Sequence, residues 1–559
     1  MNKYLRSTWV AILLPATLLS QKPVPDTFPH DDNPRQHPGA STLMPYNRLL
    51  HSAGKVISFG DSSLENHTLD LCIMPDKKNL LVEDRYGIAL ISLSSNAVIA
   101  RWSFRDDRDW KSFVSTYSGI TYFTDDHKTY IAWGAAAPDS KKSVIMIAEW
   151  DGKKIAAVSG IPVDRQEPAG LALPNQVVAQ IENGVLYIYA VLNGNDQLIK
   201  IRFSDRSIVW TARTGVAPFA ACIVHKKIYV SNWAGTQVTD TSRENAGTPW
   251  GRAYTDPVTG ATERGSLSVI DIEQGALLHE IPLGLHPNAI VKSTDDKYLY
   301  IANANSDYIS VVDVKREKVV DSIPTGIFSQ KFHFYGSSPN ALALDPATNT
   351  LYVANGMDNA LAVLQLGSRN AVYSPAKLLG FIPTEAYPSA IVVANRRLYI
   401  GNLEARGAGV LSPDKEAKKI NGNWEMAFTI HKELASCSVV AIPSRDQLAL
   451  YTKQVTRMNL FGRIKATTTA PRKNVAPVPL PERIGEPSVF RHVIYIIKEN
   501  KTYDQVLGDI SVGRGDRNLC IYGEQVTPNQ HRLAGDFCLL DNYYASGKSS
   551  AEGHQWTDA

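Results

Sequence analysis

The sequence predicts a mainly β protein, a seven-bladed β-propeller over residues 50–445 followed by the opening segment of an α/β domain. Three observations carry this prediction. A unit of short apolar strands separated by turn residues recurs seven times between residues 50 and 445. A proline-rich stretch then interrupts the pattern, and a continuous apolar run follows at residues 489–497. Finally, a chain of 559 residues exceeds what one hydrophobic core usually supports, so two or more domains are expected.

The first residues have the pattern of a secretory signal peptide, which we place at residues 1–21. Lys3 and Arg6 precede an apolar stretch, and a polar, proline-containing segment follows it. The stretch has about 11 residues, whereas a membrane span needs about 20. A buried N-terminal helix is the alternative, but Pro15 interrupts it. We therefore expect a periplasmic or secreted bacterial protein with no membrane span.

The net charge and the cysteine spacing argue against nucleic-acid binding and against a cysteine-based metal site. The formal net charge is +3, and the chain contains no long basic run, so no nucleic-acid partner is expected. The five cysteines include no CxxC pair and no His/Cys metal spacing. Cys520 and Cys538 could pair in an oxidising compartment, although their spacing alone does not decide this.

The repeat consists of an apolar strand, a turn rich in Asp, Asn or Lys, a strand centred on an aromatic or large apolar residue, and a third apolar strand. Residues 286–314 and 338–366 are the clearest copies. The second strands are marked by Leu81, Tyr130, Tyr187, Tyr229, Tyr300, Tyr352 and Tyr399. These markers recur roughly every 40 to 70 residues, and a period near 40–50 with several strands per unit is typical of a β-propeller. The longest interval is assigned to an insertion at residues 233–266.

Closing such a ring requires a strand from each end of the propeller. We expect residues 55–59 to complete the sheet that contains residues 438–442. The strands LYIAN (299–303) and LYVAN (351–355) resemble the YVTN-type repeats of seven-bladed surface-layer-like propellers, and the resemblance covers roughly residues 55–445. It is specific in four blades and loose in three.

Asparagines end several of these strands, namely Asn232, Asn303, Asn355 and Asn402. They could contact a ligand at the ring axis, but we expect the more ordinary role of capping backbone groups at the end of a strand. The propeller contains no catalytic constellation. A protein or glycan ligand on its face remains an open possibility.

Residues 446–488 are expected to form a helix and a proline-rich linker. The first part has apolar residues at helical spacing, and the second contains five prolines. Because proline fixes φ and removes a hydrogen-bond donor, we expect this second part to be an extended tether that marks the domain boundary.

The apolar run at residues 489–497 predicts a buried central strand of a parallel sheet. Glu499 and Asn500 follow directly, at the edge where open α/β sheets bind ligands. A carboxylate and an amide oxygen are hard donors suited to a divalent cation. On spacing alone, however, a helix-capping turn is the favoured explanation of this pair.

A second apolar strand is expected at residues 537–542, and it leads into a turn of small residues. This turn contains Ser549 and Ser550, and His554 lies four residues after Ser550. A hydroxyl group presented beside a metal ion is what covalent phosphoryl transfer requires. A serine–histidine hydrolase is less favoured, because the GxSxG motif is missing and no acidic partner is placed.

The segments HVIYIIKENKTYDQVLGD (492–509) and LLDNYYASGKSSAEGHQW (539–556) resemble the first two motifs of the phosphoesterase family within the alkaline phosphatase superfamily. That family includes bacterial phospholipases C and acid phosphatases. The resemblance implies a divalent metal ion held by Glu499, Asn500 and Ser550. It also implies that Ser550 is the nucleophile, with Ser549 as the alternative if the register shifts by one, and that His554 contacts the substrate phosphate.

The same resemblance implies that residues 489–559 are only the N-terminal portion of this domain, because the family completes its metal site with Asp and His residues farther along. We therefore expect an exported protein whose intact form hydrolyses phosphate mono- or diesters, with the 559-residue chain itself inactive. The alternative is a non-catalytic propeller module that binds a cell-surface ligand or a protein partner.

Overall fold

The computed structural model describes residues 42–44, 48–248, 251–328, 335–367, 373–405, 418–420, 423–425 and 433–541, together with residues 543, 545, 550, 553, 554 and 557. The predicted signal peptide at residues 1–21 lies outside the described residues. The chain divides into two compact units, Met1–Thr42 and Leu43–Ala559, and everything below concerns the second. Two short strands, β1 (Thr42–Leu43) and β2 (Leu49–Leu50), precede the propeller in the sequence.

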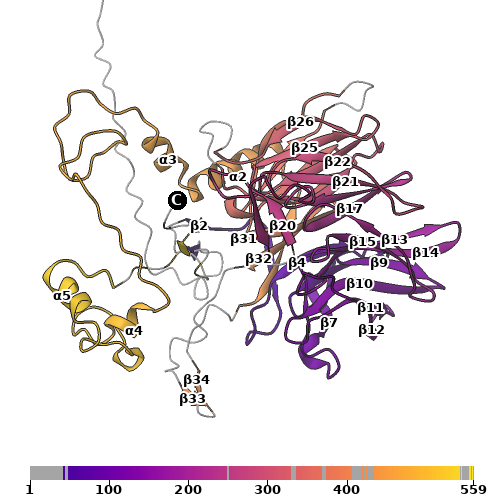
Figure 1. Ribbon diagram of the computed structural model, residues 1–559, viewed down its shortest axis with the longest axis horizontal. Helices are drawn as coiled ribbons and strands as arrows, with labels where there is room; N and C mark the ends of the chain where they lie inside the picture. Colours follow the sequence, from indigo (N-terminus) through magenta and orange to yellow (C-terminus); the bar gives the residue numbers. More distant parts are fainter. Residues whose placement is uncertain are drawn as a thin grey trace, which may run out of the picture. The chain divides into compact units, whose positions relative to one another are not determined.

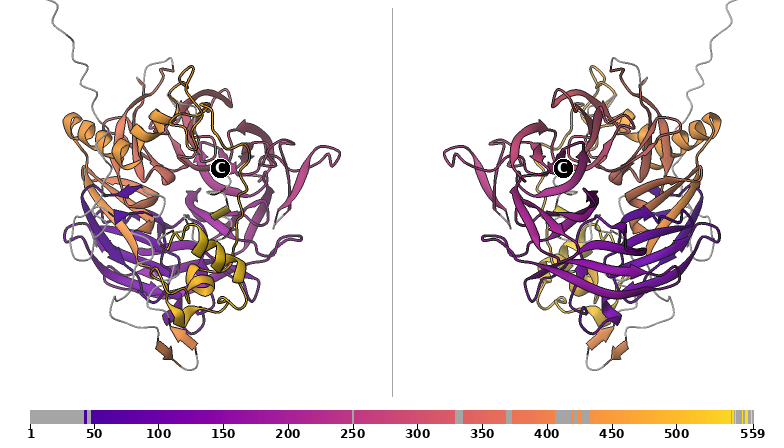
Figure 2. Two further views of the ribbon diagram at one scale, coloured as in Figure 1. Left: turned by 90° about the vertical axis from the view of Figure 1, so that its left-hand side faces the viewer. Right: turned by 90° about the vertical axis from the view of Figure 1, so that its right-hand side faces the viewer.

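Seven antiparallel sheets form the propeller within the described residues (Figures 1 and 2). Blade 1 contains β4 (Thr68–Ile73), β5 (Asn79–Asp84), β6 (Gly87–Ser92) and β7 (Ala97–Ser103). Blade 2 contains β8 (Val114–Ser115), β9 (Thr121–Asp125), β10 (Lys128–Ala137), β11 (Lys142–Trp150) and β12 (Ile155–Val163). Blade 3 contains β13 (Pro174–Glu182), β14 (Val185–Leu192), β15 (Gln197–Arg202) and β16 (Ile208–Arg213). A short 3-10 helix, η1 (Phe104–Asp106), follows β7.

Blade 4 contains β17 (Pro218–Val224), β18 (Lys227–Asn232), β21 (Gly265–Asp271) and β22 (Leu277–Leu283). Blade 5 contains β23 (Pro287–Lys292), β24 (Tyr298–Asn303), β25 (Tyr308–Asp313) and β26 (Lys318–Pro324). Blade 6 contains β27 (Pro339–Asp345), β28 (Thr350–Asn355), β29 (Ala360–Gln365) and β30 (Lys377–Pro383). Blade 7 contains β31 (Ala386–Ala394), β32 (Arg397–Ala405), β35 (Ala435–Ala441) and β3 (Lys55–Phe59). Another 3-10 helix, η2 (Gly356–Asp358), lies between β28 and β29.

The seven marker residues of the repeat lie in seven different sheets, each in β5, β10, β14, β18, β24, β28 or β32. The prediction of a seven-bladed propeller is therefore confirmed. Adjacent blades share their cores: Ile145 of blade 2, for example, packs in one cluster with Ile188 and Ile199 of blade 3. Because each sheet is covered on both faces in this way, its inner strands are apolar on both faces.

Ring closure follows the predicted route. Strand β3 pairs antiparallel with β35, from Lys55 opposite Val439 to Phe59 opposite Ala435. Ile57 and Phe59 are buried in the same cluster as Cys437 of β35. The N-terminal strand of the propeller therefore completes the last blade.

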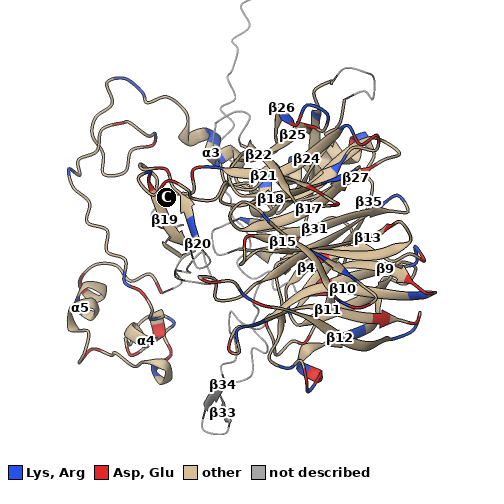
Figure 3. Ribbon diagram, turned by 45° about the vertical axis from the view of Figure 1, so that its right-hand side comes forward, with Lys and Arg blue, Asp and Glu red and all other residues tan. Residues whose placement is uncertain are grey.

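The predicted insertion between β18 and β21 contains its own hairpin, β19 (Asn245–Thr248) and β20 (Gly251–Tyr254). The hydroxyl of Tyr254 accepts hydrogen bonds from the backbone N–H groups of Thr239 and Asp240. A second hairpin, β33 (Lys418–Ile420) with β34 (Asn423–Glu425), lies between β32 and β35 in the sequence. Figure 3 shows Lys and Arg interspersed with Asp and Glu over the propeller.

The four strand-ending asparagines are fully buried. Asn355 Nδ2 donates to the carbonyl oxygen of Thr325, 2.8 Å away, at the end of the preceding blade. In Asn232 and Asn402 the same group donates to serine hydroxyls of the neighbouring strand. These side chains join strands within the ring and present no surface to a ligand.

After the last blade, α2 (Arg445–Met458) and α3 (Phe461–Thr467) form where helical spacing was predicted. The Ser444 side chain caps α2 by accepting a hydrogen bond from the N–H of Gln447. Leu448 and Val455 are buried in clusters formed with blades of the propeller. The helix therefore belongs to the propeller's packing.

The proline-rich residues after α3 do not form the simple extended tether that we expected. Arg472 Nε and one of its terminal nitrogens donate to the two carboxylate oxygens of Glu486 at 2.7 and 2.9 Å, which closes this segment into a loop. A backbone bridge also joins Val478, within this loop, to Ser488 just after it. A bidentate guanidinium–carboxylate pair is geometrically specific enough to fold back a chain that proline alone would keep extended.

The segment after residue 489 contains α4 (Tyr503–Leu507), η3 (Arg517–Leu519) and α5 (Pro528–Asp536). Neither predicted strand forms: residues 489–497 and the described part of 537–542 belong to no sheet. Val493, Ile494 and Ile496 are 77–86% exposed. A central parallel strand needs neighbours on both edges and cover on both faces, and the described residues of this segment supply neither. The α/β part of the predicted fold class is therefore not found.

Two other sequence-based expectations concern this part of the chain. Cys520 and Cys538 are both free thiols, so the disulfide that the sequence left open is not formed. Among the described residues, no helix has the length and apolar character needed to cross a membrane.

Candidate functional site

The predicted Glu-Asn pair lies in a sharp turn directly before α4. Asn500 has φ of +52°, the left-handed conformation that asparagine tolerates better than most residues. Thr502 then caps α4 by a reciprocal arrangement: its hydroxyl accepts from the N–H of Gln505, and the Gln505 side chain accepts from the N–H of Thr502. This capped turn fixes the backbone from which Glu499 and Asn500 project.

The structure brings the four predicted site residues together. The Ser550 hydroxyl donates to Asn500 Oδ1 at 2.9 Å, although 50 positions separate the two residues. Asn500 Nδ2 donates to Glu499 Oε1 at 3.2 Å. His554 Nε2 lies 3.4 Å from Glu499 Oε2. We call Glu499, Asn500, Ser550 and His554 the Ser550 cluster.

The physical route to this cluster differs from the one predicted. We expected two parallel strands to carry Glu499 and Ser550 to one sheet edge, but the strands are absent from the described residues. A turn supplies Glu499 and Asn500, and Ser550 approaches from the segment after α5. The alternative nucleophile, Ser549, lies outside the described residues.

Electrostatics in the cluster favour an ionised Glu499. The pKa of Glu499 is lowered, mainly by a hydrogen bond from the Ser550 side chain and further by His554, and loss of solvation opposes this shift. Because the Ser550 hydroxyl has one proton, Glu499 and Asn500 Oδ1 are alternative acceptors for it. The Glu499 and His554 side chains are 41% and 40% exposed. The cluster is therefore open to solvent, and a substrate could reach it without a conformational change.

The donors fit a hard divalent cation. The Glu499 carboxylate, the Asn500 amide oxygen and the Ser550 hydroxyl are all oxygen ligands. The 2.9 Å between Ser550 Oγ and Asn500 Oδ1 matches the separation of neighbouring ligands around a small cation. These three residues would hold the ion, and His554 would lie beside it.

A second polar group, which the sequence did not single out, stabilises the same segment. His531 Nε2 lies 2.8 Å from Asp509 Oδ1, and its Nδ1 lies 2.9 Å from the carbonyl oxygen of Thr527. Hydrogen bonds from the N–H of Glu524 and from His531 hold the pKa of Asp509 below its usual range. This group ties α5 to the turn after α4. It contains no motif spacing that could have revealed it from the sequence.

Comparison with known proteins adds little to this geometry. No family model matches the chain, and no curated protein matches it. Among solved structures, the chain is similar to the hydrazine synthase of Kuenenia stuttgartiensis, at 13% identity and a TM-score of 0.43, covering 61% of this chain and 93% of that one. A similarity at this level carries no argument about function.

Proposed function

We propose that this protein is an exported, metal-dependent phosphoesterase in which Ser550 is the nucleophile. The observation that supports it best is the contact between the Ser550 hydroxyl and Asn500 Oδ1, beside Glu499 and His554. The sequence resemblance predicted these four residues as one site, and a chance arrangement of exposed side chains would have no reason to join them across 50 positions.

The proposed reaction uses each residue of the cluster. The Ser550 oxygen loses its proton and attacks the phosphorus of a phosphate mono- or diester, while the bond to the ester alcohol breaks on the opposite side and the alcohol takes up a proton from solvent. Water then hydrolyses the seryl intermediate, which releases phosphate when the substrate is a monoester and a phosphate monoester when it is a diester. A divalent cation, when bound, lowers the pKa of the hydroxyl and offsets the negative charge of the phosphoryl group. Glu499 and Asn500 orient the Ser550 hydroxyl, and His554 lies where it can hydrogen-bond a phosphate oxygen.

Hydrolysis of aryl phosphates tests this proposal. We expect a form of the protein that also carries the family's further Asp and His ligands to hydrolyse p-nitrophenyl phosphate or its bis ester in the presence of Zn²⁺ or Mn²⁺, and to lose that activity in EDTA. Turnover by the longer form that persists in EDTA, or no turnover with any divalent cation, would argue against a metal-dependent phosphoesterase.

A non-catalytic propeller module is the second candidate, and one observation favours it. A cavity of about 580 Å³ is lined by blade 3, the loop before it and the insertion that contains the β19–β20 hairpin. It is lined by polar groups that include Asp196, Arg213, Gln237 and Arg252. Burial raises the pKa of Asp196 to about 6. A polar cavity of this kind suits a glycan or a polar peptide, which a propeller could bind whether or not Ser550 is catalytic.

A further inference from the structure

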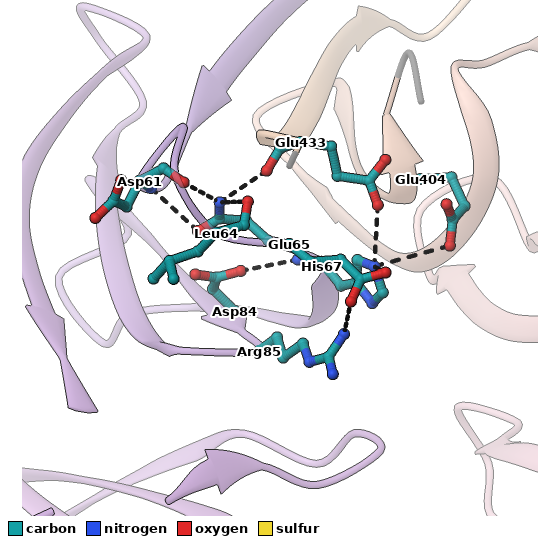
Figure 4. A network of polar contacts seen from close by, with 9 residues as sticks. Asp61, Leu64, Glu65, His67, Asp84, Arg85, Glu404 and Glu433 are labelled. Carbon is teal, nitrogen blue, oxygen red and sulfur yellow. Dashed lines mark hydrogen bonds and ion pairs between the residues drawn. The ribbon is translucent and has the colours of Figure 1, made fainter. Parts of the chain in front are cut away.

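One histidine and three glutamates converge where blade 7 meets blade 1 (Figure 4). His67 Nε2 lies 3.1 Å from Glu433 Oε1. It also lies 3.9 Å from Glu65 Oε1 and 3.9 Å from Glu404 Oε1. One ligand atom from each of Glu65, His67 and Glu433 lies within 4.8 Å of the others. We call these four residues the blade-junction cluster.

The four residues come from distant parts of the chain. Glu65 and His67 lie between β3 and β4, Glu404 is near the end of β32, and Glu433 lies two residues before the start of β35. The backbone fixes their approach. The N–H of Glu433 donates to the Leu64 carbonyl at 3.1 Å, and the N–H of Asn66 donates to the Glu433 carbonyl at 3.1 Å.

Neighbouring residues hold two of these ligand residues, Glu65 and His67, in position. Arg85 forms an ion pair with Glu65, and the N–H of His67 donates to Asp84 Oδ1 at 3.0 Å. Asp84 is 2% exposed, and its Oδ2 has no hydrogen-bond partner among the described residues. These contacts hold the side chain of Glu65 and the backbone of His67 in place.

The cluster is sheltered from water. The side chain of Glu433 is 1% exposed, that of Glu65 15%, that of His67 16% and that of Glu404 27%. Carboxylates gathered in so little water repel one another, and a cation placed between them removes that cost. Both the geometry and the burial therefore favour a bound positive charge in front of His67 Nε2.

We propose that the blade-junction cluster binds a divalent transition-metal ion, with Zn²⁺ as the probe. One imidazole nitrogen with carboxylate oxygens is a mixed donor set that suits Zn²⁺ better than Ca²⁺ or Mg²⁺, which prefer oxygen ligands alone. Bonds of about 2.0–2.1 Å in a tetrahedral site separate neighbouring ligands by about 3.3 Å. The measured separations of 3.1 and 3.9 Å from His67 Nε2 lie on either side of that value.

Such an ion would stabilise the closed ring of the propeller. Glu65 and His67 follow the N-terminal strand β3, whereas Glu404 and Glu433 belong to the C-terminal blade. The metal would therefore cross-link the two ends of the propeller at the point where β3 and β35 close it. Because the unfolded chain cannot assemble these ligands, binding adds to the stability of the folded ring.

The test is Zn²⁺ stoichiometry and affinity in the full chain, in a Glu499→Gln background so that the Ser550 cluster contributes as little as possible. We expect one tightly bound Zn²⁺ per chain. His67→Gln should weaken binding by at least about 100-fold and remove the thermal stabilisation that Zn²⁺ provides. X-ray absorption should show one imidazole nitrogen at about 2.0–2.1 Å in the background chain.

His286→Gln is the matched control. His286 directly precedes the first strand of blade 5, as His67 does in blade 1, but its ring stacks on Trp233 at 4.4 Å. This variant should bind Zn²⁺ as tightly as the background chain. Glu404→Gln offers a second reduction in affinity if His67→Gln loses its native circular dichroism spectrum. No stoichiometric Zn²⁺, or equal affinity in the background chain and the folded ligand variant, would overturn the proposal.

Discussion

Replacing Ser550 by Ala should lower phosphate-ester hydrolysis by about 10⁴-fold or more in any form of the protein that turns over, because no other group would form the covalent intermediate. Binding of the divalent cation should weaken but persist, since Glu499 and Asn500 keep their oxygens. Steady-state hydrolysis of p-nitrophenyl phosphate and a parallel cation titration measure the two effects separately.

Ser488→Ala is the control for this variant. Ser488 lies in the same part of the chain, but its hydroxyl donates to the Pro479 carbonyl at 3.0 Å and touches none of the Ser550 cluster. We expect its activity to match that of the unmodified protein. A Ser550→Ala protein that retains more than a few per cent of the activity would rule out Ser550 as the nucleophile.

The second large effect is a loss of propeller stability as the pH rises from 4 to 7. Asp70 and Glu83 lie opposite each other in strands β4 and β5. Burial raises the pKa of Asp70 to about 6, and burial followed by the charge of Asp70 raises the pKa of Glu83 well above its usual value. Both acids are therefore protonated in the folded state over a range where the unfolded chain ionises them.

The sign of the effect follows from these shifts. Below about pH 4 both states are protonated and the stability is complete; it falls as the pH passes the unfolded pKa values and continues to fall up to the folded ones. Each unit of pKa shift corresponds to about 1.4 kcal/mol. Between pH 4 and pH 7 we expect the Glu83→Gln variant to lose less stability than the unmodified chain, measured by urea unfolding.

Glu273→Gln supplies the comparison, because Glu273 is an exposed residue paired with Lys226. Its pH dependence should follow that of the unmodified chain. If Glu83→Gln follows it as well, the buried acids of blade 1 are not what makes the stability depend on pH.

Much of the propeller could be predicted from sequence because its signals are local. Each blade contains its own apolar strands and its own turn residues, so a marker such as Tyr300 or Tyr352 identifies a sheet without knowledge of its neighbours. Even ring closure was accessible, since β3 is an apolar strand that directly precedes the first repeat. The blade count and the closing pair were therefore both confirmed.

The segment after residue 489 could not be predicted in the same way, because a parallel strand is defined by its neighbours. Residues 489–497 have the composition of a buried strand, yet no partner strand lies beside them in the described residues, and they remain exposed. The contact between Ser550 and Asn500 formed without the sheet that we had used to predict it.

The blade-junction cluster was missed because its residues share no motif spacing. His67 and Glu433 are 366 positions apart and meet only through ring closure. The predicted pairing of β3 with β35 did contain the information, because Glu65 lies six residues after the end of β3 and Glu433 lies two residues before the start of β35. A search for ligand residues flanking the closing strands could have found the cluster.

The most direct test of the proposed Ser550 site is a Mn²⁺ titration of the full chain in a His67→Gln background, which removes the blade-junction cluster. We predict one Mn²⁺ whose dissociation constant rises at least about 10-fold in Glu499→Gln and in Asn500→Ala, and less in Ser550→Ala. Inorganic phosphate should bind only when Mn²⁺ is present. Equal Mn²⁺ affinity in the background chain and all three variants would contradict the assignment of Glu499, Asn500 and Ser550 to one metal site.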